Sequence, residues 1–444
     1  MLLSRRSLLA SAIFQPSSPL AADPDRPRFH FLPLSNWMND PNAPIWHKGQ
    51  YHLYYQHNPK AAKWDTMHWG HAASPDLLHW QHRPIALAPT PGGPDKDGCF
   101  TGCMVIDHGT PSIVYTGVRP EVQCIATSQD MNTWTKHPRN PVVAAPPPGV
   151  DTPGFRDPHV WREGDAWLML VGAGFRGKGG TALLYESKDL VEWTYLKPLL
   201  TGAIDPAAKG GDVARGEMWE CPDFFPVGNK WLFYVSTENK VRYWLGEWKS
   251  RTFTPHSSGV LAHGAAYAPK SSNASQGRRI IWCWLREQRS GQDQLKAGWS
   301  GAMSLAVVPS LAKDGTLLLD PAAEYTKLRG RRQTEAPPAD CCEIHVELSG
   351  RAPFGLTRGA VEVIGYDPDT RTLSAGRSEA KLPASGSIDL RIFLDGSVVE
   401  VFADRRVWLT GRVYGSYQAL AMTGKVKRLE SWPLEPVSKD RLTT

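Results

Sequence analysis

Hydrophobic residues in the first two thirds of the chain come in short runs rather than at helical spacing. Between residue 50 and about residue 310, these runs are rich in β-branched and aromatic side chains and are bounded by Gly, Pro, Asn or Asp; examples are Tyr51–Tyr55, Ser112–Tyr115 and Trp231–Val235. A long pattern with an apolar residue at every third or fourth position is absent from this stretch. The pattern therefore predicts an all-β architecture.

A polar signature recurs within this strand-rich region. Three segments fit the pattern Ser-x-Asp-x-x-x-Trp, namely Ser74–Trp80, Ser128–Trp134 and Ser187–Trp193, and Gly246–Phe253 is a candidate for a degenerate fourth copy. The three tryptophans lie 54 and 59 residues apart, a spacing that suits one four-stranded sheet per repeat. A stretch of about 270 residues has room for about five such sheets, so we predict a five-bladed β-propeller over residues 23–324.

The last quarter of the chain predicts a second domain. Residues 325–340 are basic and contain prolines, which is typical of a linker. Strand-like runs then follow one another through residues 341–444, and the pair Asp395-Gly396 signals a tight turn between the last two of them. We therefore expect a C-terminal β-sandwich over residues 341–444.

The composition fits a globular protein of two domains and limits the classes of partner that the protein is expected to bind. The chain has 444 residues, and no run approaches the roughly 18 apolar residues that a membrane span needs. The formal charge of +6 is spread along the chain without the basic blocks of nucleic-acid-binding arms. We expect neither a membrane span nor a nucleic-acid partner, and the oligomeric state is left open. The 18 tryptophans suit sheet cores and also sugar rings.

The N-terminus has the pattern of an export signal. Arg5 and Arg6 precede an apolar stretch and then a segment of small residues that ends at Ala22. Two arginines before an apolar segment are typical of a twin-arginine signal, so we expect residues 1–22 to direct export to the periplasm or the outside of the cell. The alternative is a disordered N-terminal tail.

Three acidic segments carry the candidate chemistry. Asp40 lies between two carboxamides, Asp157 lies between an arginine and a proline, and Glu220 has aromatic and apolar neighbours. Taken alone, an Asp next to a Pro more often opens a turn. One acid to protonate and one carboxylate to attack are, however, the minimum equipment for retaining glycoside hydrolysis, and a propeller can bring distant acids together at its central channel.

Together these segments, Trp37–Asn42, Arg156–Pro158 and Met218–Phe225, resemble the three acidic motifs of glycoside hydrolase family 32, the family of invertases, levanases and inulinases. Further blocks match the family's order between about residues 28 and 415, and they are Tyr54–Pro59, Trp64 with Met67–Ala72, Cys99–Gly102, Ala297–Leu305 and Leu390–Phe402. Each block is weak alone, whereas the ordered set is specific. The resemblance implies a five-bladed propeller followed by a β-sandwich, in agreement with the repeat.

The resemblance also implies residue roles in the cleavage of terminal β-fructofuranosidic bonds. Asp40 is expected to attack the fructosyl unit, Glu220 to act as acid and then as base, and Asp157 to stabilise the transition state. The residues expected to bind substrate are Asn39, Gln56, Trp64, Phe100, Thr101, Arg156, Tyr267 and Trp284. Blade packing is the alternative for Trp64 and Phe100, and a turn hydrogen bond is the alternative for Gln56.

No cofactor or metal is expected. The seven cysteines form neither a Cys-x-x-Cys pair nor a Cys/His cluster at zinc-ligand spacing. His57, His68 and His71 lie in blocks that resemble non-metal segments of the family, so we expect structural hydrogen bonds from them.

One departure from the family concerns the leaving group. Ala265 stands where the family commonly has an Asp that can reach a sugar in the leaving-group subsite, so we expect glucose to be held differently than in typical invertases. The expected substrates are sucrose, fructo-oligosaccharides, inulin or levan. The alternatives are fructosyl transfer by the same residues, a catalytically weak fructan-binding module, and an arabinan-cleaving propeller enzyme.

Overall fold

The computed structural model describes residues 23–335, 341–415 and 418–438. Strands make up nearly all of the regular structure in these residues. The helical segments among them are short, and they are α2 (Gly291–Ala297), η1 (Ser275–Gly277) and η2 (Ala323–Leu328). The predicted export signal, residues 1–22, lies outside the described residues.

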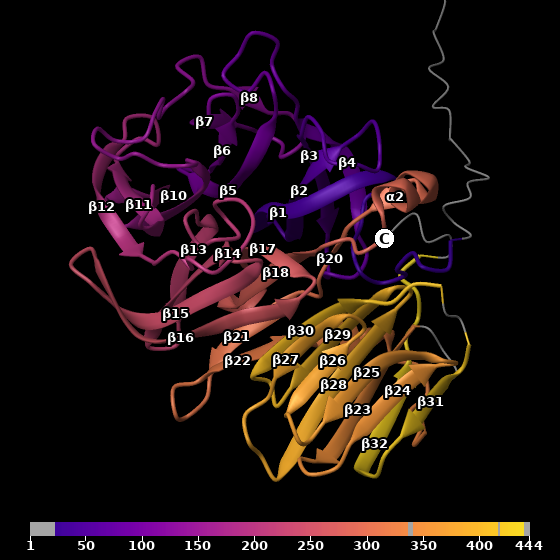
Figure 1. Cartoon of the computed structure of the whole chain (residues 1–444). Helices are drawn as coiled ribbons and strands as arrows, with labels where there is room; N and C mark the ends of the chain where they lie inside the picture. Colours follow the sequence, from indigo (N-terminus) through magenta and orange to yellow (C-terminus); the bar gives the residue numbers. More distant parts are fainter. Residues whose placement is uncertain (1–22, 336–340, 416–417, 439–444) are drawn as a thin grey trace, which may run out of the picture.

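The N-terminal domain consists of antiparallel sheets whose strands follow the order of the chain (Figure 1). The first three sheets contain β1 (Asn36–His47), β2 (Gln50–Asn58), β3 (His68–Ser74) and β4 (Gln81–Leu87); β5 (Cys99–Asp107), β6 (Thr110–Gly117), β7 (Val122–Thr127) and β8 (Thr135–Lys136); and β9 (Arg156–Glu163), β10 (Ala166–Phe175), β11 (Gly179–Ser187) and β12 (Thr194–Thr201).

The remaining strands of this domain continue the same order. They are β13 (Glu220–Val227), β14 (Lys230–Thr237), β15 (Lys240–Lys249) and β16 (Thr252–Gly264), and then β17 (Ala266–Asn273), β18 (Arg279–Leu285), β20 (Ala302–Met303), β21 (Val307–Leu311) and β22 (Leu317–Pro321). The short strand β19 (Trp299–Ser300) pairs in parallel with β1, which joins the end of the domain to its beginning.

The first strand of each sheet faces the centre of this domain. These strands contact one another in the order β1, β5, β9, β13, β17 and back to β1, so they form a closed ring. A closed ring of first strands around a channel is the arrangement of a β-propeller. The predicted propeller architecture is therefore confirmed. The number of five blades stays a prediction, because hydrogen bonding continues from β16 into the second domain.

The Ser-x-Asp-x-x-x-Trp signature forms the turn between the third and fourth strands of three sheets. In each copy the serine hydroxyl donates to the aspartate, at 3.1 Å, and the indole N–H donates to the carbonyl three residues earlier. The residue after the aspartate has a positive φ in every copy, and these residues are Leu77, Met131 and Leu190. The repeat therefore specifies a turn geometry that fixes the entry of each outer strand.

The C-terminal domain is a sandwich of two sheets. One sheet contains β23 (Cys341–Ser349), β28 (Ser387–Asp395), β29 (Val398–Ala403), β30 (Val407–Arg412) and β32 (Val426–Pro433), and the other contains β24 (Phe354–Arg358), β25 (Val361–Asp367), β26 (Thr372–Ala375), β27 (Ser378–Lys381) and β31 (Leu420–Thr423). Alternating apolar residues from both sheets fill the space between them. The predicted β-sandwich is thus confirmed.

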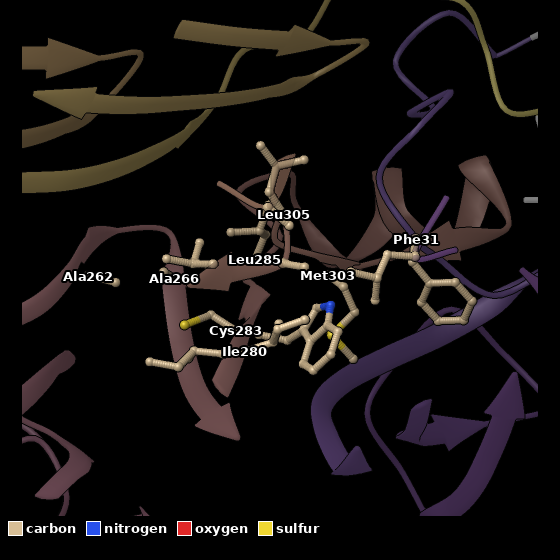
Figure 2. Packing of buried hydrophobic residues seen from close by; sticks show 14 of the residues in the cluster. Phe31, Ala262, Ala266, Ile280, Cys283, Leu285, Met303 and Leu305 are labelled. Atoms are coloured by element: carbon tan, nitrogen blue, oxygen red, sulfur yellow. The ribbon is translucent and has the colours of Figure 1, made fainter. Parts of the chain in front are cut away.

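The two domains share one apolar core. A single cluster runs from β1 and β18 of the propeller to Phe393, Phe402 and Trp408 of the sandwich. Figure 2 shows part of this cluster, where side chains of β18 and β20 pack together and Phe31 lies beside Met303. The domains are therefore joined by packing as well as by the chain.

The described part of the predicted linker is packed rather than extended into solvent. Tyr325 is buried, and its hydroxyl accepts a hydrogen bond from the Ala306 N–H at 3.0 Å. Arg329 forms an ion pair with Glu343 of the sandwich at 2.7 Å. Residues 325–335 thus hold the two domains together, and the predicted domain boundaries stay predictions.

Candidate active site

Each of the ring-forming strands carries an irregularity at the same end of the channel. The pairing register shifts at Asn39-Asp40 in β1, at Thr101 in β5 and at the residue pairs Asp157-Pro158, Cys221-Pro222 and Ala268-Pro269 in β9, β13 and β17. A β-bulge adds a residue to one strand and redirects its side chains. The bulges therefore turn functional groups from separate sheets toward one end of the channel.

Three of these bulges share a local conformation. Asp157, Cys221 and Ala268 have φ values of 67°, 50° and 50°, and each precedes a proline. A positive φ is costly for a residue with a side chain, and such strain persists only where the surroundings impose it. The residues before these three, Arg156, Glu220 and Tyr267, consequently occupy matching positions on neighbouring strands.

The bulged ends surround a cavity of about 440 Å³. All eleven residues predicted for the site line it, and they are Asn39, Asp40, Gln56, Trp64, Phe100, Thr101, Arg156, Asp157, Glu220, Tyr267 and Trp284. Glu121 and Cys221 complete the lining. The structure thus brings the predicted residues into one place, while their individual roles stay predictions.

Asp40 is held by donors on both of its oxygens. Asn39 donates to Oδ1 at 3.0 Å, and the Thr101 hydroxyl donates to Oδ2 at 2.6 Å. Burial raises the pKa of Asp40, and the negative charge of Glu220 acts in the same direction. The hydrogen bonds oppose this shift because they favour the ionised form. Asp40 is therefore an oriented carboxylate in a poorly hydrated place.

Asp157 lies deeper than Asp40. Its side chain accepts a hydrogen bond from the Cys221 N–H at 3.0 Å, and the Cys221 thiol lies 3.5 Å from one oxygen each of Asp157 and Asp40. Burial raises the pKa of Asp157 to about 7, with Arg156 opposing the shift and the charges of Glu220 and Asp40 adding to it. An ionised Asp157 has unsatisfied acceptor capacity that a polyhydroxylated ligand can fill.

Glu220 belongs to a row of hydrogen-bonded side chains rather than to the apolar surroundings that its neighbours in the sequence indicated. Arg156 donates to Glu220 Oε1 at 2.8 and 3.2 Å, and the Tyr267 hydroxyl donates to Oε2 at 2.7 Å. Arg156 also donates to Glu121 at 2.9 Å. The guanidinium is therefore shared between two carboxylates.

Aromatic side chains form the walls of the cavity. Trp64 is 52% exposed and meets Phe100 edge to face, with ring centroids 6.1 Å apart. Trp284 packs against Trp37 on the side of Tyr267, with centroids 5.8 Å apart. An exposed indole beside a cavity of carboxylates is an arrangement that suits a sugar ring. Gln56 is buried and donates to the Cys99 carbonyl at 3.1 Å.

Sequence reasoning missed Glu121 and the thiol of Cys221. Glu121 lies in the turn before β7, where no motif marks it, and it is identified by its place in the cavity lining and by its contact with Arg156. Cys221 precedes Pro222 as Asp157 precedes Pro158, and this equivalence was the available signal. Ala265 is buried, its N–H bonds to the Thr410 carbonyl of the sandwich, and it is not among the residues that line the cavity.

Each of the three histidines that were expected to make structural hydrogen bonds has a polar neighbour within the protein. His57 Nδ1 lies 2.8 Å from the Trp37 carbonyl, His68 Nδ1 lies 3.2 Å from the Thr66 carbonyl, and His71 pairs with His52. Across the described residues, no group of His, Cys, Asp and Glu side chains is arranged to hold a metal ion. In the same residues, no helix has the length and apolar character for a membrane span.

Most of the chain resembles known proteins. Residues 30–321 match the family model of the glycosyl hydrolases family 32 N-terminal domain, and residues 319–432 match that of the family 32 C-terminal domain. A sucrose-6-phosphate hydrolase of Escherichia coli is 36% identical over 87% of this chain and 89% of its own length. A raffinose invertase of Escherichia coli is 34% identical over 93% of this chain and 94% of its own length.

Solved structures agree with the sequence matches. The crystal structure of fructan 1-exohydrolase IIa from Cichorium intybus has a TM-score of 0.79 to this chain and is 26% identical to it. The alignment covers 93% of this chain and 98% of that one. The similarity therefore extends over the propeller and the sandwich together.

Proposed function

The chain belongs to glycosyl hydrolase family 32 and is a β-fructofuranosidase, and we propose that Asp40 is its nucleophile and Glu220 its acid and base. The observation that carries this proposal is the convergence of both carboxyl groups, with Asp157, in one aromatic-walled cavity. Two carboxyl groups with different surroundings are what retaining hydrolysis requires. We expect about 5 to 5.5 Å between them when fructose is bound.

In the first step, an Asp40 oxygen attacks the anomeric carbon of the fructosyl unit. The bond from this carbon to the glycosidic oxygen breaks, and Glu220 gives its proton to the departing oxygen. The products of this step are a fructosyl ester of Asp40 and a free leaving group. The donors Asn39 and Thr101 orient the attacking carboxylate.

In the second step, water replaces the enzyme on the fructosyl carbon. Glu220, now a carboxylate, takes a proton from the water while the oxygen of that water bonds to the anomeric carbon. The ester bond breaks, so Asp40 regains its negative charge and fructose leaves with retained configuration. Two displacements on the same carbon account for this retention.

The two hydrogen-bonding partners of Glu220, Arg156 and Tyr267, suit a group that changes its charge between the two steps. The Tyr267 hydroxyl can donate to the ionised carboxylate or accept from the protonated carboxyl. Arg156 contacts Glu121 as well as Glu220, so its charge remains compensated when Glu220 holds a proton. Both neighbours thus tolerate either state of Glu220.

Asp157 is proposed to bind fructose hydroxyls and to stabilise positive charge that develops on the sugar. It is buried beside the attacking carboxylate and can accept hydrogen bonds in its ionised form. A carboxylate fixed before the reaction costs no reorganisation as charge develops. This role does not require contact with the bond that breaks.

The leaving group is proposed to be an uncharged sugar. A second cavity of about 390 Å³ shares Arg156, Glu220, Tyr267 and Trp284 with the first. The charged residues that it adds are Asp212 and Arg286. Arg286 donates to main-chain carbonyls and lies 4.9 Å from the centre of the Tyr267 ring, so much of its donor capacity is used.

A phosphorylated leaving group would need stronger compensation than this cavity offers. Both arginines of this cavity already have partners, since Arg156 binds two carboxylates and Arg286 binds main-chain carbonyls. Phosphate recognition favours several free cationic donors. We therefore favour sucrose, raffinose-type oligosaccharides or fructans over sucrose 6-phosphate. Release of fructose from sucrose 6-phosphate at a higher kcat/KM than from sucrose would overturn this preference.

Export by a twin-arginine signal is part of the proposal. Its support is the pair Arg5-Arg6 before an apolar segment. Replacing both arginines with lysine in the full-length chain should leave the protein inside the cell, as measured by cell fractionation. Equal export of both forms would contradict this part of the proposal and leave the chemistry unaffected.

The catalytic proposal is tested by measuring fructose release from sucrose, 1-kestose, inulin and levan. Wild-type protein should release fructose from at least one of them, and Asp40→Ala and Glu220→Ala should each lower kcat by about 10³-fold or more. Asp165→Ala is the matched control, because Asp165 is exposed and remote from the cavity. Full activity in Asp40→Ala would remove it as the nucleophile.

A further inference from the structure

The central channel has a cavity at each end. Opposite the catalytic cavity, a space of about 540 Å³ is lined by the other halves of β1, β5, β9, β13 and β17. Among the residues that the structure describes, the two linings have no member in common. Lys270 of β17 belongs to the lining of the opposite cavity, is 1% exposed, and reaches the strands that carry Asp157 and Glu220.

The Lys270 ammonium contacts three main-chain carbonyls. Its Nζ lies 3.5 Å from the Asp157 oxygen, 3.5 Å from the Pro158 oxygen and 3.2 Å from the Pro222 oxygen. A lysine ammonium has three N–H donors, so these three acceptors match its capacity. No ion pair found among the described residues includes Lys270, which makes carbonyl binding its principal polar interaction.

These carbonyls lie in the bulges that shape the catalytic cavity. Asp157 and Pro158 lie between the paired residues Arg156 and His159 of β9, and Pro222 lies between the paired residues Glu220 and Asp223 of β13. A bulge interrupts the ladder of backbone hydrogen bonds. Lys270 donates to carbonyls of both bulges from a third strand, so one ammonium group connects the two irregular segments.

The charge of Lys270 also lies close to the acidic groups of the channel. The titratable and charged groups that face it come from four strands, and they are Cys103, Asp157, His159, Cys221, Asp223 and Arg279. Lys270 lowers the pKa of Asp157, against the larger effect of burial. Its removal should therefore raise the pKa of Asp157 further.

We propose that Lys270 is a positioning residue for hydrolysis, which fixes the bulges bearing Asp157 and Glu220 and offsets part of the negative charge in the catalytic cavity. The proposal rests on the assignment of those two residues to the reaction. Lys270 does not line the catalytic cavity, so it acts through the backbone and through its charge. Misplacement of catalytic groups by about 1 Å can cost about 100-fold in rate.

The test compares Lys270→Met, which removes the donors and the charge, with Lys270→Gln, which keeps amide donors, and Lys270→Arg, which keeps the charge. Lys230→Met is the matched control, because Lys230 also donates to a carbonyl, that of Gly315, outside both cavities. For each folded variant, kcat and KM for sucrose are measured across pH, and thermal unfolding is followed by circular dichroism.

Lys270→Met should lower kcat by about 100-fold with a smaller change in KM, and the acid limb of its kcat/KM profile should move to higher pH. Lys270→Arg should restore the position of that limb, and Lys230→Met should match the wild type.

A purely structural role would lower activity equally at every pH, and that result overturns the proposal, as does wild-type kcat in Lys270→Met. Should Lys270→Met not fold, the same comparison is made with Lys270→Gln, whose unchanged profile overturns it equally. Absence of fructose release by the wild type refutes the proposed function instead.

Discussion

At the scale of single residues, Asp157 is a buried carboxyl group whose pKa is strongly raised by its surroundings. Burial raises its pKa from the ordinary value of 3.8 to about 7, so the folded chain binds more protons than the unfolded chain between these values. Its contribution to the free energy of unfolding is therefore largest near pH 4 and declines as pH rises toward 7. Burial of Asp40 acts in the same direction.

Asp157→Asn should remove this decline, because an amide does not titrate. The variant should gain stability relative to the wild type as pH rises from about 4 to about 7. Urea unfolding at a series of pH values measures the difference, with exposed Asp165→Asn as the control. A constant difference between variant and wild type over this range would show that Asp157 titrates normally.

The Tyr267 hydroxyl offers a second test at this scale. Tyr267→Phe removes the 2.7 Å hydrogen bond to Glu220 and keeps the aromatic wall. A hydrogen bond to a charged group contributes about 1.5 to 3 kcal/mol, so kcat for sucrose should fall by about 10- to 100-fold. Tyr51→Phe, which removes a hydroxyl contact with Ser275, should keep wild-type activity. Equal kcat in Tyr267→Phe and wild type would exclude a role for this hydroxyl.

The site residues that the sequence identified share a position in ordered motifs. Asp40, Asp157 and Glu220 could be predicted because each lies in a block that matches a family pattern. Their contacts could not be predicted in this way, since the pairing of Arg156 with both Glu121 and Glu220 depends on strands that meet only in the folded ring. The contacts of Lys270 likewise join strands that meet only in the folded ring, so the sequence does not indicate them.

At the scale of elements, the repeated turn links sequence to structure most directly. Ser187 donates to Asp189 and accepts from the Leu190 N–H at 3.0 Å, and both contacts recur in the Ser128 copy. Ser187→Ala should lower the free energy of unfolding by about 1 kcal/mol and leave kcat unchanged. Ser257→Ala, at an exposed site on β16, is the control. No loss of stability in Ser187→Ala would contradict the account of this turn.

Strands and turns could be predicted from the sequence, whereas the bulges could not. Short apolar runs between Gly, Pro, Asn and Asp identify strands such as β2 and β14 because these runs reflect burial on a sheet. The ring strands are buried on nearly every side, so no alternation marks where the register shifts. The prolines at 158, 222 and 269 follow residues with positive φ and are the local signal that remains.

At the scale of the whole molecule, the interface between the two domains includes a buried charged cluster. His30 lies between Asp395 at 2.9 Å and Glu400 at 3.0 Å, and these two carboxylates raise its pKa to about 8 despite burial. Because the folded pKa exceeds the ordinary value of 6.5, the resulting stability is fully present below about pH 6.5 and is lost as pH rises through 8.

His30→Gln should therefore destabilise the protein more at pH 6 than at pH 9, as measured by urea unfolding. The exposed residue His256, replaced in the same way, should show no such dependence. A penalty for His30→Gln that is equal at both pH values would show that folding does not raise the pKa of His30.

The two-domain architecture could be predicted, but the contacts at the interface between the domains could not. Basic and proline-containing composition indicates a linker, yet Tyr325 and Arg329 are positioned by contacts with both domains. Such contacts join residues far apart in the sequence, for example His30 and Asp395, and no local pattern encodes them. The domain interface can consequently be identified only from the folded structure.

The central claim is that this enzyme cleaves β-fructofuranosidic bonds with retention through Asp40 and Glu220. Time-resolved NMR of sucrose hydrolysis tests it most directly, because it identifies the first-formed anomer of fructose before mutarotation. The account predicts that β-fructofuranose appears first, together with an equal amount of glucose, and that Asp40→Ala forms neither. Initial release of the α-anomer, or no fructose from sucrose or any β-fructan, would contradict it.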